Sequence, residues 1–166
     1  AHDVVLSADN TKAYVASGSN GLKIVSISDP NNPSLIATIN TPGYANGVIL
    51  SGDGNTAYVS DTTAGGLQII NVSNPSSPSI LGSYNSNYGS DWDTAISPDG
   101  NKAFIADSDQ GLQIVDISDP SNPTSIRSYT YASNWSKPSA LGVAISPDGN
   151  TAYIAGQHDG LVVIDV

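Results

Sequence analysis

The residues best suited to bind a ligand lie in polar segments between short apolar stretches of this sequence. Tyrosine and tryptophan rings stack on sugars or pack against a protein partner, while aspartate and asparagine oxygens accept hydrogen bonds from hydroxyl groups. We predict a ligand-binding set of His2, Asn46, Tyr88, Trp92, Tyr131 and Trp135. The alternative is that these aromatic rings only cover the longer connections between strands.

Two pairs of carboxylates could bind a metal ion. Asp91 and Asp93 form one pair and Asp107 and Asp109 the other. Hard oxygen ligands of this kind suit calcium, which is the candidate cofactor. Neither pair completes an Asp-x-Asp-x-Asp-Gly loop, and the sequence contains no glutamate. We therefore expect that no cofactor binds and that the carboxylates are solvated, with calcium at these two pairs as the alternative.

Two tripeptides match the acceptor pattern for N-linked glycosylation. One begins at Asn71 and the other at Asn134, which lies in the longest polar segment. Asn134 is the better placed of the two, because the modification needs an exposed loop.

Four copies of one pattern position these residues. Each copy contains Ser-x-Asp followed by Gly or Asn, a short strand with Ala-Tyr or Ala-Phe, and a Gly-Leu pair that opens another apolar strand. The serines of the four copies (7, 51, 97 and 146) are spaced by 44, 46 and 49 residues. A period in the forties built from short strands is typical of β-propeller blades. We predict an all-β propeller with blades over residues 1–43, 44–88, 89–133 and 134–166.

The third copy illustrates how one repeat forms a blade. Its predicted strands cover residues 94–96, 102–106, 111–117 and 124–131. The third of these strands is apolar on both faces, as expected for a sheet packed between two others. The fourth copy stops after its third strand, so the last blade is predicted to lack its outer strand. We favour a segment of a longer propeller over a four-bladed ring whose open edge pairs with another chain.

One face of such a propeller gathers most of the candidate residues. Connections between blades, and loops between second and third strands, lie on that face, which is the usual ligand site of the fold. Aligned on the serines that follow, four different residues occupy the start of the innermost strands: His2, Asn46, Trp92 and Leu141. The loops between second and third strands add Asp61, Asp107, Asp109, His158 and Asp159. The copies differ most on this face, as a specific site requires.

Composition excludes several classes of partner. All 15 acidic residues are aspartate, which favours turns, and five basic residues leave a net charge of −10. This charge repels nucleic acid and anionic membrane surfaces. No apolar run is long enough to insert into a membrane. Cysteine is absent, so disulfides and thiolate metal sites are excluded.

The repeats resemble a known family. Gly-Leu-Gln-Ile-Val-Asp-Ile-Ser-Asp-Pro-Ser-Asn-Pro, over residues 111–123, is similar to the LVIVD repeat, and the Ser-Pro-Asp-Gly-Asn segments resemble the YVTN-type propeller repeat. The resemblance implies an extracellular or cell-surface protein and carries no catalytic residue set. Ser26 and Asn71 depart from the pattern, where the later copies have Asp116 and Asp165.

These observations predict an extracellular, non-catalytic module for binding, adhesion or assembly. Its partner would be a protein, a carbohydrate, or a second copy paired through the open blade edge. No Gly-x-Ser-x-Gly elbow, phosphate loop or His-Glu-x-x-His pair is present, so we do not expect an enzyme. The alternatives are a metal-dependent hydrolase or lactonase-like enzyme at the channel mouth, and a calcium-stabilised repeat segment of a larger surface protein.

Overall fold

The structure is a computed structural model that describes residues 1–62, 65–85, 91–131 and 139–166, with backbone alone for residues 91 and 92. These residues form fifteen strands and no helix, and hence no helix that could cross a membrane. The strands are β1 Asp3–Leu6, β2 Lys12–Ala16, β3 Leu22–Ser26, β4 Ser34–Ile39, β5 Tyr44–Leu50, β6 Thr56–Thr62, β7 Gly66–Asn71, β8 Ser79–Tyr84, β9 Asp91–Ile96, β10 Lys102–Asp107, β11 Gly111–Asp116, β12 Thr124–Tyr129, β13 Ala140–Ile145, β14 Thr151–Gly156 and β15 Gly160–Asp165.

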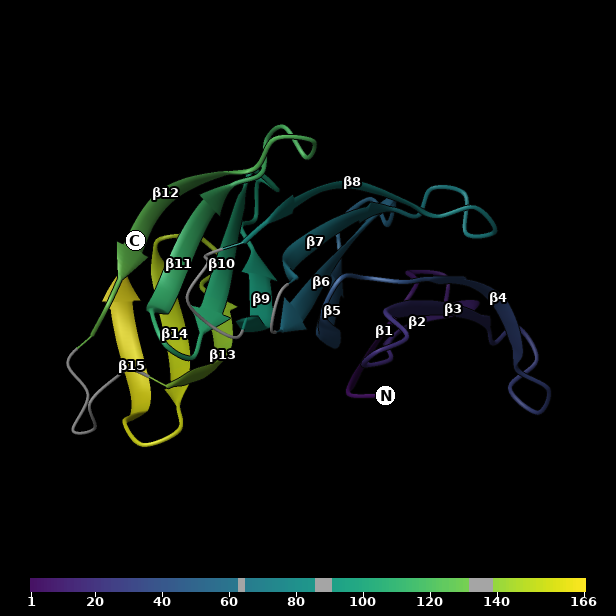
Figure 1. The fold of residues 1–166 in the computed structure, drawn as a ribbon, viewed down its shortest axis with the longest axis horizontal. Coiled ribbons are helices and arrows are strands. Elements are labelled where there is room, and N and C mark those ends of the chain that lie inside the picture. The colour runs from purple at the N-terminus through teal and green to yellow at the C-terminus, as the bar shows by residue number, and fades with distance from the viewer. Residues whose placement is uncertain (63–64, 86–90, 132–138) are drawn as a thin grey trace.

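The strands form four antiparallel sheets, and in each sheet the strands pair in chain order. Blade 1 contains β1 to β4, blade 2 contains β5 to β8, and blade 3 contains β9 to β12. Blade 4 contains only β13, β14 and β15. Figure 1 shows the sheets following one another in a row, with blade 1 in purple at one end and blade 4 in yellow at the other. The prediction of an all-β propeller whose last blade lacks its outer strand is confirmed.

The Ser-x-Asp motif shapes the turn between the first two strands of every blade. In blade 3, the Ser97 hydroxyl donates to Asp99 Oδ1 at 2.5 Å, and the Asn101 backbone N–H donates to the same oxygen at 3.1 Å. The Lys102 N–H donates to Ser97 Oγ at 2.9 Å. The other three blades repeat these bonds. The turn thus satisfies polar groups locally where the sheet ladder stops.

Apolar packing between successive sheets holds the blades together. We call the side of a blade that faces the preceding blade its leading face, and the side that faces the following blade its trailing face. The trailing face of blade 2 presents Tyr58, Leu67 and Ile69. They pack against the leading face of blade 3, which presents Ala103, Ile105, Val115 and Ile117. All seven side chains are at most 6% exposed, so this junction is a true core.

Replacing Ile105 tests the importance of this junction. Ile105 is fully buried, and Ile105→Ala should lower the free energy of unfolding by about 2–5 kcal/mol through lost burial and a residual cavity. Ile126 is 50% exposed on β12, and Ile126→Ala should change stability by less than about 1 kcal/mol. Urea unfolding of the two variants and the parent chain measures both values. Equal losses in the two variants would contradict the assignment of the core.

Candidate functional site at the entrance of the inner strands

The innermost strands of blades 2, 3 and 4 each contain a β-bulge at the same position. In blade 2, Ala45 pairs with Asp61 and Gly47 with Ser60, so Asn46 is the extra residue. The same register shift leaves Trp92 extra in β9 and Leu141 extra in β13. Bulges re-aim a side chain and are frequent beside active sites. The position at which the repeats carry different residues is therefore a bulge in three of the four blades.

His2 occupies the corresponding position in blade 1 and pairs with an aromatic ring of blade 2. Its Nε2 atom lies 3.1 Å from the Tyr44 hydroxyl, and the two rings meet edge to face with centroids 5.1 Å apart. Both side chains are exposed, with Tyr44 at 41%. The pair presents an imidazole, a hydroxyl and a ring edge to solvent. We call this end of the blades the entrance face.

The loop between β2 and β3 fixes the position of Tyr44. Gly18 exchanges two backbone hydrogen bonds with Ala45, at 3.0 and 3.1 Å, and so ties this loop to the next blade. Gly18 has a φ of 60°, and a Cβ atom on it would lie 2.8 Å from Tyr44 Cζ. A side chain at this position would strain the backbone and displace the Tyr44 ring, so glycine is favoured there. This close approach could not be predicted from the sequence, because Gly18 lies outside the repeated motifs.

Asp61 is a fully buried carboxylate close to the bulge of blade 2. Its Oδ1 atom accepts a hydrogen bond from the Thr41 hydroxyl at 2.8 Å, and Oδ2 accepts one from the Gly43 N–H at 2.7 Å. Burial raises the pKa of Asp61 above its usual value, against the opposing effect of these two donors. Asp61 therefore anchors the connection between blades 1 and 2.

Asp93, a predicted calcium ligand, joins blade 3 to blade 4. Its Oδ2 atom accepts a hydrogen bond from the Val143 N–H at 3.0 Å, and Oδ1 accepts one from the adjacent Thr94 N–H at 2.9 Å. Burial is the main cause that raises the pKa of Asp93. Asp3 makes the same bonds in blade 1, to Val48 N–H at 2.9 Å and Val4 N–H at 2.8 Å. Each of the two carboxylates therefore links its own blade to the following blade by a hydrogen bond, and we call these aspartates latches.

Of the remaining predicted calcium ligands, Asp107 and Asp109 lie in one loop, and the side chain of Asp91 is not among the described ones. Asp107 is fully buried, and its Oδ1 atom accepts hydrogen bonds from the backbone N–H groups of Asp109 and Gln110, at 2.9 and 3.2 Å. Asp91 pairs with Asp107 in the sheet register, and its side chain is not described. Among the described residues, no three His, Cys, Asp or Glu side chains gather as a metal site. Calcium binding stays a prediction.

The predicted aromatic set is only partly within the described residues. Tyr131 is half-buried against the core between blades 3 and 4, with its Cε1 atom 3.3 Å from a Cβ built on Gly111. Burial is the main cause that raises its pKa. Tyr88 and Trp135 lie outside the described residues, and for Trp92 only the backbone is placed. Of the predicted set, His2 is exposed at the entrance face, whereas Asn46 at the bulge is buried, with 9% of its surface exposed.

Of the two predicted glycosylation sites, the one at Asn71 lies within the described residues. The Asn71 side-chain oxygen accepts hydrogen bonds from the backbone N–H and the hydroxyl of Ser73, at 2.9 and 2.7 Å. The amide of this sequon is thus held by its own serine in a local turn. Asn134 lies outside the described residues. Modification at either site stays a prediction.

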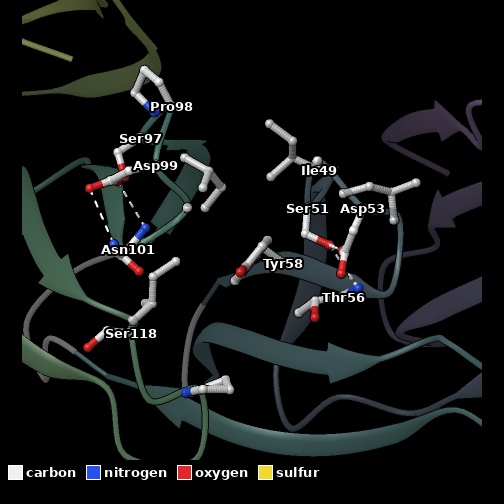
Figure 2. A pocket seen from close by; sticks show the side chains of 16 residues that line it. Ile49, Ser51, Asp53, Thr56, Tyr58, Ser97, Pro98, Asp99, Asn101 and Ser118 are labelled. Atoms are coloured by element: carbon white, nitrogen blue, oxygen red, sulfur yellow. Dashed lines mark hydrogen bonds between the residues drawn. The ribbon is translucent and has the colours of Figure 1, made fainter. Parts of the chain in front are cut away.

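A pocket that sequence reasoning missed lies at the opposite end of the blades. It has a volume of about 580 Å³ and lies between the Ser-x-Asp turns of blades 2 and 3. Figure 2 shows the Ser51 and Asp53 turn on one side, the Ser97 and Asp99 turn on the other, and Tyr58 between them. The serine hydrogen bonds, followed by those from the backbone, lower the pKa values of both aspartates. The sequence analysis interpreted the repeated turns as structural, so it did not predict a pocket between two of them.

Comparison with known families identifies the repeats. The LVIVD repeat model matches residues 1–41, 42–86, 89–131 and 133–166, and the chain belongs to the LVIVD repeat family. The resemblance of residues 111–123 to that repeat is confirmed. Comparison with curated proteins found no match.

Many solved structures share this fold at low sequence identity. The periplasmic gluconolactonase of Pseudomonas aeruginosa superposes with a TM-score of 0.77 at 16% identity, covering 99% of this chain and 52% of the other. The Cps50 (Swd1) β-propeller domain of Myceliophteria thermophila gives a TM-score of 0.79 at 14% identity, covering 99% and 50%. A putative 6-phosphogluconolactonase from Bacteroides uniformis gives 0.70 at 16%, covering 99% and 52%. The chain thus spans about half the length of these structures.

The expectation that the chain is not an enzyme is contradicted by these comparisons. Two of the three similar structures carry the names of lactonases. The argument against an enzyme relied on the absence of familiar nucleophile, phosphate and zinc motifs. That absence does not exclude catalysis on a propeller, because residues from several blades can act together without forming a continuous motif.

The opposite pKa shifts of the turn and buried aspartates predict opposite effects on acid stability. The pKa of Asp99 is lowered from 3.8, so its stabilisation is present above that pH and is lost as the pH falls. The pKa of Asp61 is raised, so its charged form costs stability as the pH rises through the folded-state value. Asp99→Asn should therefore lose less stability than the parent between pH 7 and pH 3, and Asp61→Asn should lose more.

Urea unfolding midpoints of both variants and the parent at pH 7 and pH 3 test this prediction. Each asparagine keeps a side-chain oxygen as acceptor and removes the titration. Changes of the same sign in both variants would contradict the assignment.

Proposed function

We propose that the entrance face binds a small polyhydroxylated molecule of the sugar or sugar-acid class. The observation that carries this proposal is the repeated bulge, which places Asn46, Trp92 and Leu141 at equivalent positions in three blades. A fold that only repeated itself would keep one residue type at this position. Different residues at one re-aimed position are what an asymmetric ligand requires.

The His2 and Tyr44 pair supplies the chemistry for such a ligand. The imidazole and the phenol, 3.1 Å apart, offer donors and acceptors to neighbouring hydroxyl groups. Two backbone bonds between Gly18 and Ala45 hold Tyr44 in place before a ligand binds. Preorganisation of this kind lowers the entropic cost of binding. A glycan on a partner would present the same hydroxyl groups, so the proposal includes adhesion to a glycosylated surface.

We also propose a periplasmic or extracellular location for this binding. The support is the resemblance of the repeats to those of secreted and surface proteins, together with the periplasmic gluconolactonase among the similar structures. Free sugars, sugar acids and surface glycans are all accessible in those compartments.

Binding can be tested with gluconate and glucose as probes. Ligand-observed NMR titration should give binding to the parent chain that Tyr44→Phe and Asn46→Ala each weaken about three- to tenfold, the loss expected for one hydrogen bond. Tyr153→Phe is the matched control, since Tyr153 is 40% exposed on another blade and Tyr44 is 41% exposed. Unchanged binding in both test variants would contradict the entrance-face site.

Lactone hydrolysis is a second candidate function, favoured by the two lactonases among the similar structures. In this reaction water attacks the lactone carbonyl carbon, and the ring C–O bond breaks to give a hydroxy acid. The His2 imidazole, hydrogen-bonded to Tyr44, is placed to take the proton from the attacking water and return it to the ring oxygen. No cofactor enters this scheme.

Hydrolysis of glucono-δ-lactone, followed by pH-stat against the spontaneous rate, tests the second candidate. The parent chain should accelerate the reaction, and His2→Gln should lower the enzymatic rate by about 10²–10⁴, the usual contribution of a general base. Tyr153→Phe again serves as the control. A rate no greater than the spontaneous one would exclude this function and leave the binding proposal to its own test.

A further inference from the structure

The pocket between the turns of blades 2 and 3 lies away from the entrance face, and the function proposed above does not use it. Its volume of about 580 Å³ is within the range of small-molecule sites. Apolar and polar side chains both line it, among them Ile49, Ile96 and Ile117 on one hand and Asp53, Asn101 and Ser118 on the other. We call it the turn pocket. A ligand that fits it combines an apolar body with a charged or polar group.

Tyr58 places a buried hydroxyl group in the turn pocket. Its side chain is only 6% exposed and lines the pocket, and Figure 2 shows it between the two turns. Within the described part of the chain, this hydroxyl makes no hydrogen bond to another residue. Buried hydroxyl groups normally have a hydrogen-bond partner. The partner of Tyr58 is therefore to be sought outside the chain.

Asp53 supplies a negative charge near this hydroxyl. Hydrogen bonds from the Ser51 hydroxyl at 2.6 Å and the Asn55 backbone N–H at 3.0 Å hold the pKa of Asp53 below its usual value, so the carboxylate is ionised at neutral pH. Burial, followed by the charge of Asp53, raises the pKa of Tyr58, so the phenol stays protonated. Among the described residues, Asp53 forms no ion pair.

The chain itself shows which group such a pocket accepts. A smaller pocket of about 290 Å³ lies between the turns of blades 1 and 2, where Asp9 and Tyr14 take the places of the aspartate and tyrosine just described. Lys12 lines this smaller pocket, and its Nζ atom lies 3.8 Å from Asp9 Oδ2. Blade 2 has Thr56 at the position of Lys12, and the turn pocket has about twice the volume. The turn pocket thus repeats the carboxylate and the phenol without a lysine of its own.

We propose that the turn pocket binds a primary alkylammonium ion, an aliphatic chain that ends in a charged amino group. The ammonium group donates hydrogen bonds to the Asp53 carboxylate and to the Tyr58 hydroxyl oxygen. The aliphatic chain packs on Ile96 and Ile117, which line the same pocket. The net charge of −10 raises the concentration of cations near the surface. A free aliphatic amine and the lysine side chain of a partner protein share this chemistry.

Pentylamine is the first probe, and pentanol is the uncharged control of the same length. In an NMR titration of the isotope-labelled parent chain, pentylamine should give saturable shifts of the Gly52 and Gly100 amides, and pentanol none. Asp53→Asn should weaken binding about tenfold and Tyr58→Phe about three- to tenfold, the losses expected for a charged and a neutral hydrogen bond. Asparagine keeps an acceptor for the turn, and Phe104 occupies the position of Tyr58 in blade 3, so both variants should fold.

Asp148→Asn is the matched control, because it removes the same charge from the corresponding turn of blade 4. It should leave pentylamine binding within about twofold of the parent, since surface charge alone is a weak, screened effect. Equal losses in Asp53→Asn and Asp148→Asn would show general attraction of cations and would overturn the proposal. Equal binding of pentanol would overturn it as well.

Thr56→Lys is the sharpest variant, because it gives the turn pocket the lysine that the smaller pocket already has. The added ammonium group should compete with pentylamine and weaken its binding at least about tenfold, whereas Thr151→Lys in blade 4 should have little effect. Undiminished binding to Thr56→Lys would overturn the proposal. Titration with cadaverine and with Nα-acetyl-lysine methylamide then identifies the source: tighter binding of the first supports a free amine, and tighter binding of the second supports a partner's lysine side chain.

Discussion

Each sheet of this chain depends on having both faces covered by another sheet. The third strands of blades 2 and 3 are fully buried over almost their whole length, with apolar side chains on both faces. Burying a Leu or Ile side chain contributes about 1.5–3 kcal/mol, and an isolated small sheet would leave half of these residues in water. The unit of stability is therefore the junction between two blades. Ser60 and Thr94 share a hydrogen bond across the junction of blades 2 and 3, where the other junctions have Ala16 with Val48 and Ala106 with Val143. A polar residue on one side alone would bury an unpaired hydroxyl.

The same constraint separates the positions that can vary from those that cannot. A bulged residue such as Asn46 stands outside the sheet ladder, so the pairing of the strands does not determine its identity. The Ser-x-Asp turns have no such freedom, because each serine and aspartate satisfies backbone groups where the ladder ends. A propeller can thus change its function without changing its core. The fold itself is shared at 14–16% identity by a gluconolactonase and by the Cps50 propeller domain.

Local signals in the sequence were sufficient to predict the strands, the turns and the short last blade. Gly-Leu pairs, Ser-x-Asp turns and apolar runs each act within a few residues, and their spacing repeats. The roles of single polar residues could not be predicted in this way. The hydrogen bond from the Val143 N–H to Asp93 Oδ2, between residues 50 positions apart, had no counterpart in the sequence pattern. The contact of Tyr44 with Gly18 likewise depends on how two blades meet. Interactions across a junction leave no local pattern.

Asp3 and Asp93 occupy the inner strands of blades 1 and 3, whereas blades 2 and 4 have Gly47 and Gly142 at the equivalent positions. A latch carboxylate gains two backbone hydrogen bonds, but it must be buried to reach the next blade, and burial raises the pKa of Asp93. Asp3, two blades away, adds a smaller repulsion that raises it further. A latch on every blade would bring like charges closer in a chain that already carries a net charge of −10. The Cβ of a residue replacing Gly142 would have ordinary space, 3.7 Å from Asp93 Oδ2, so crowding does not require glycine there. A carboxylate at that position would instead be disfavoured by repulsion from Asp93.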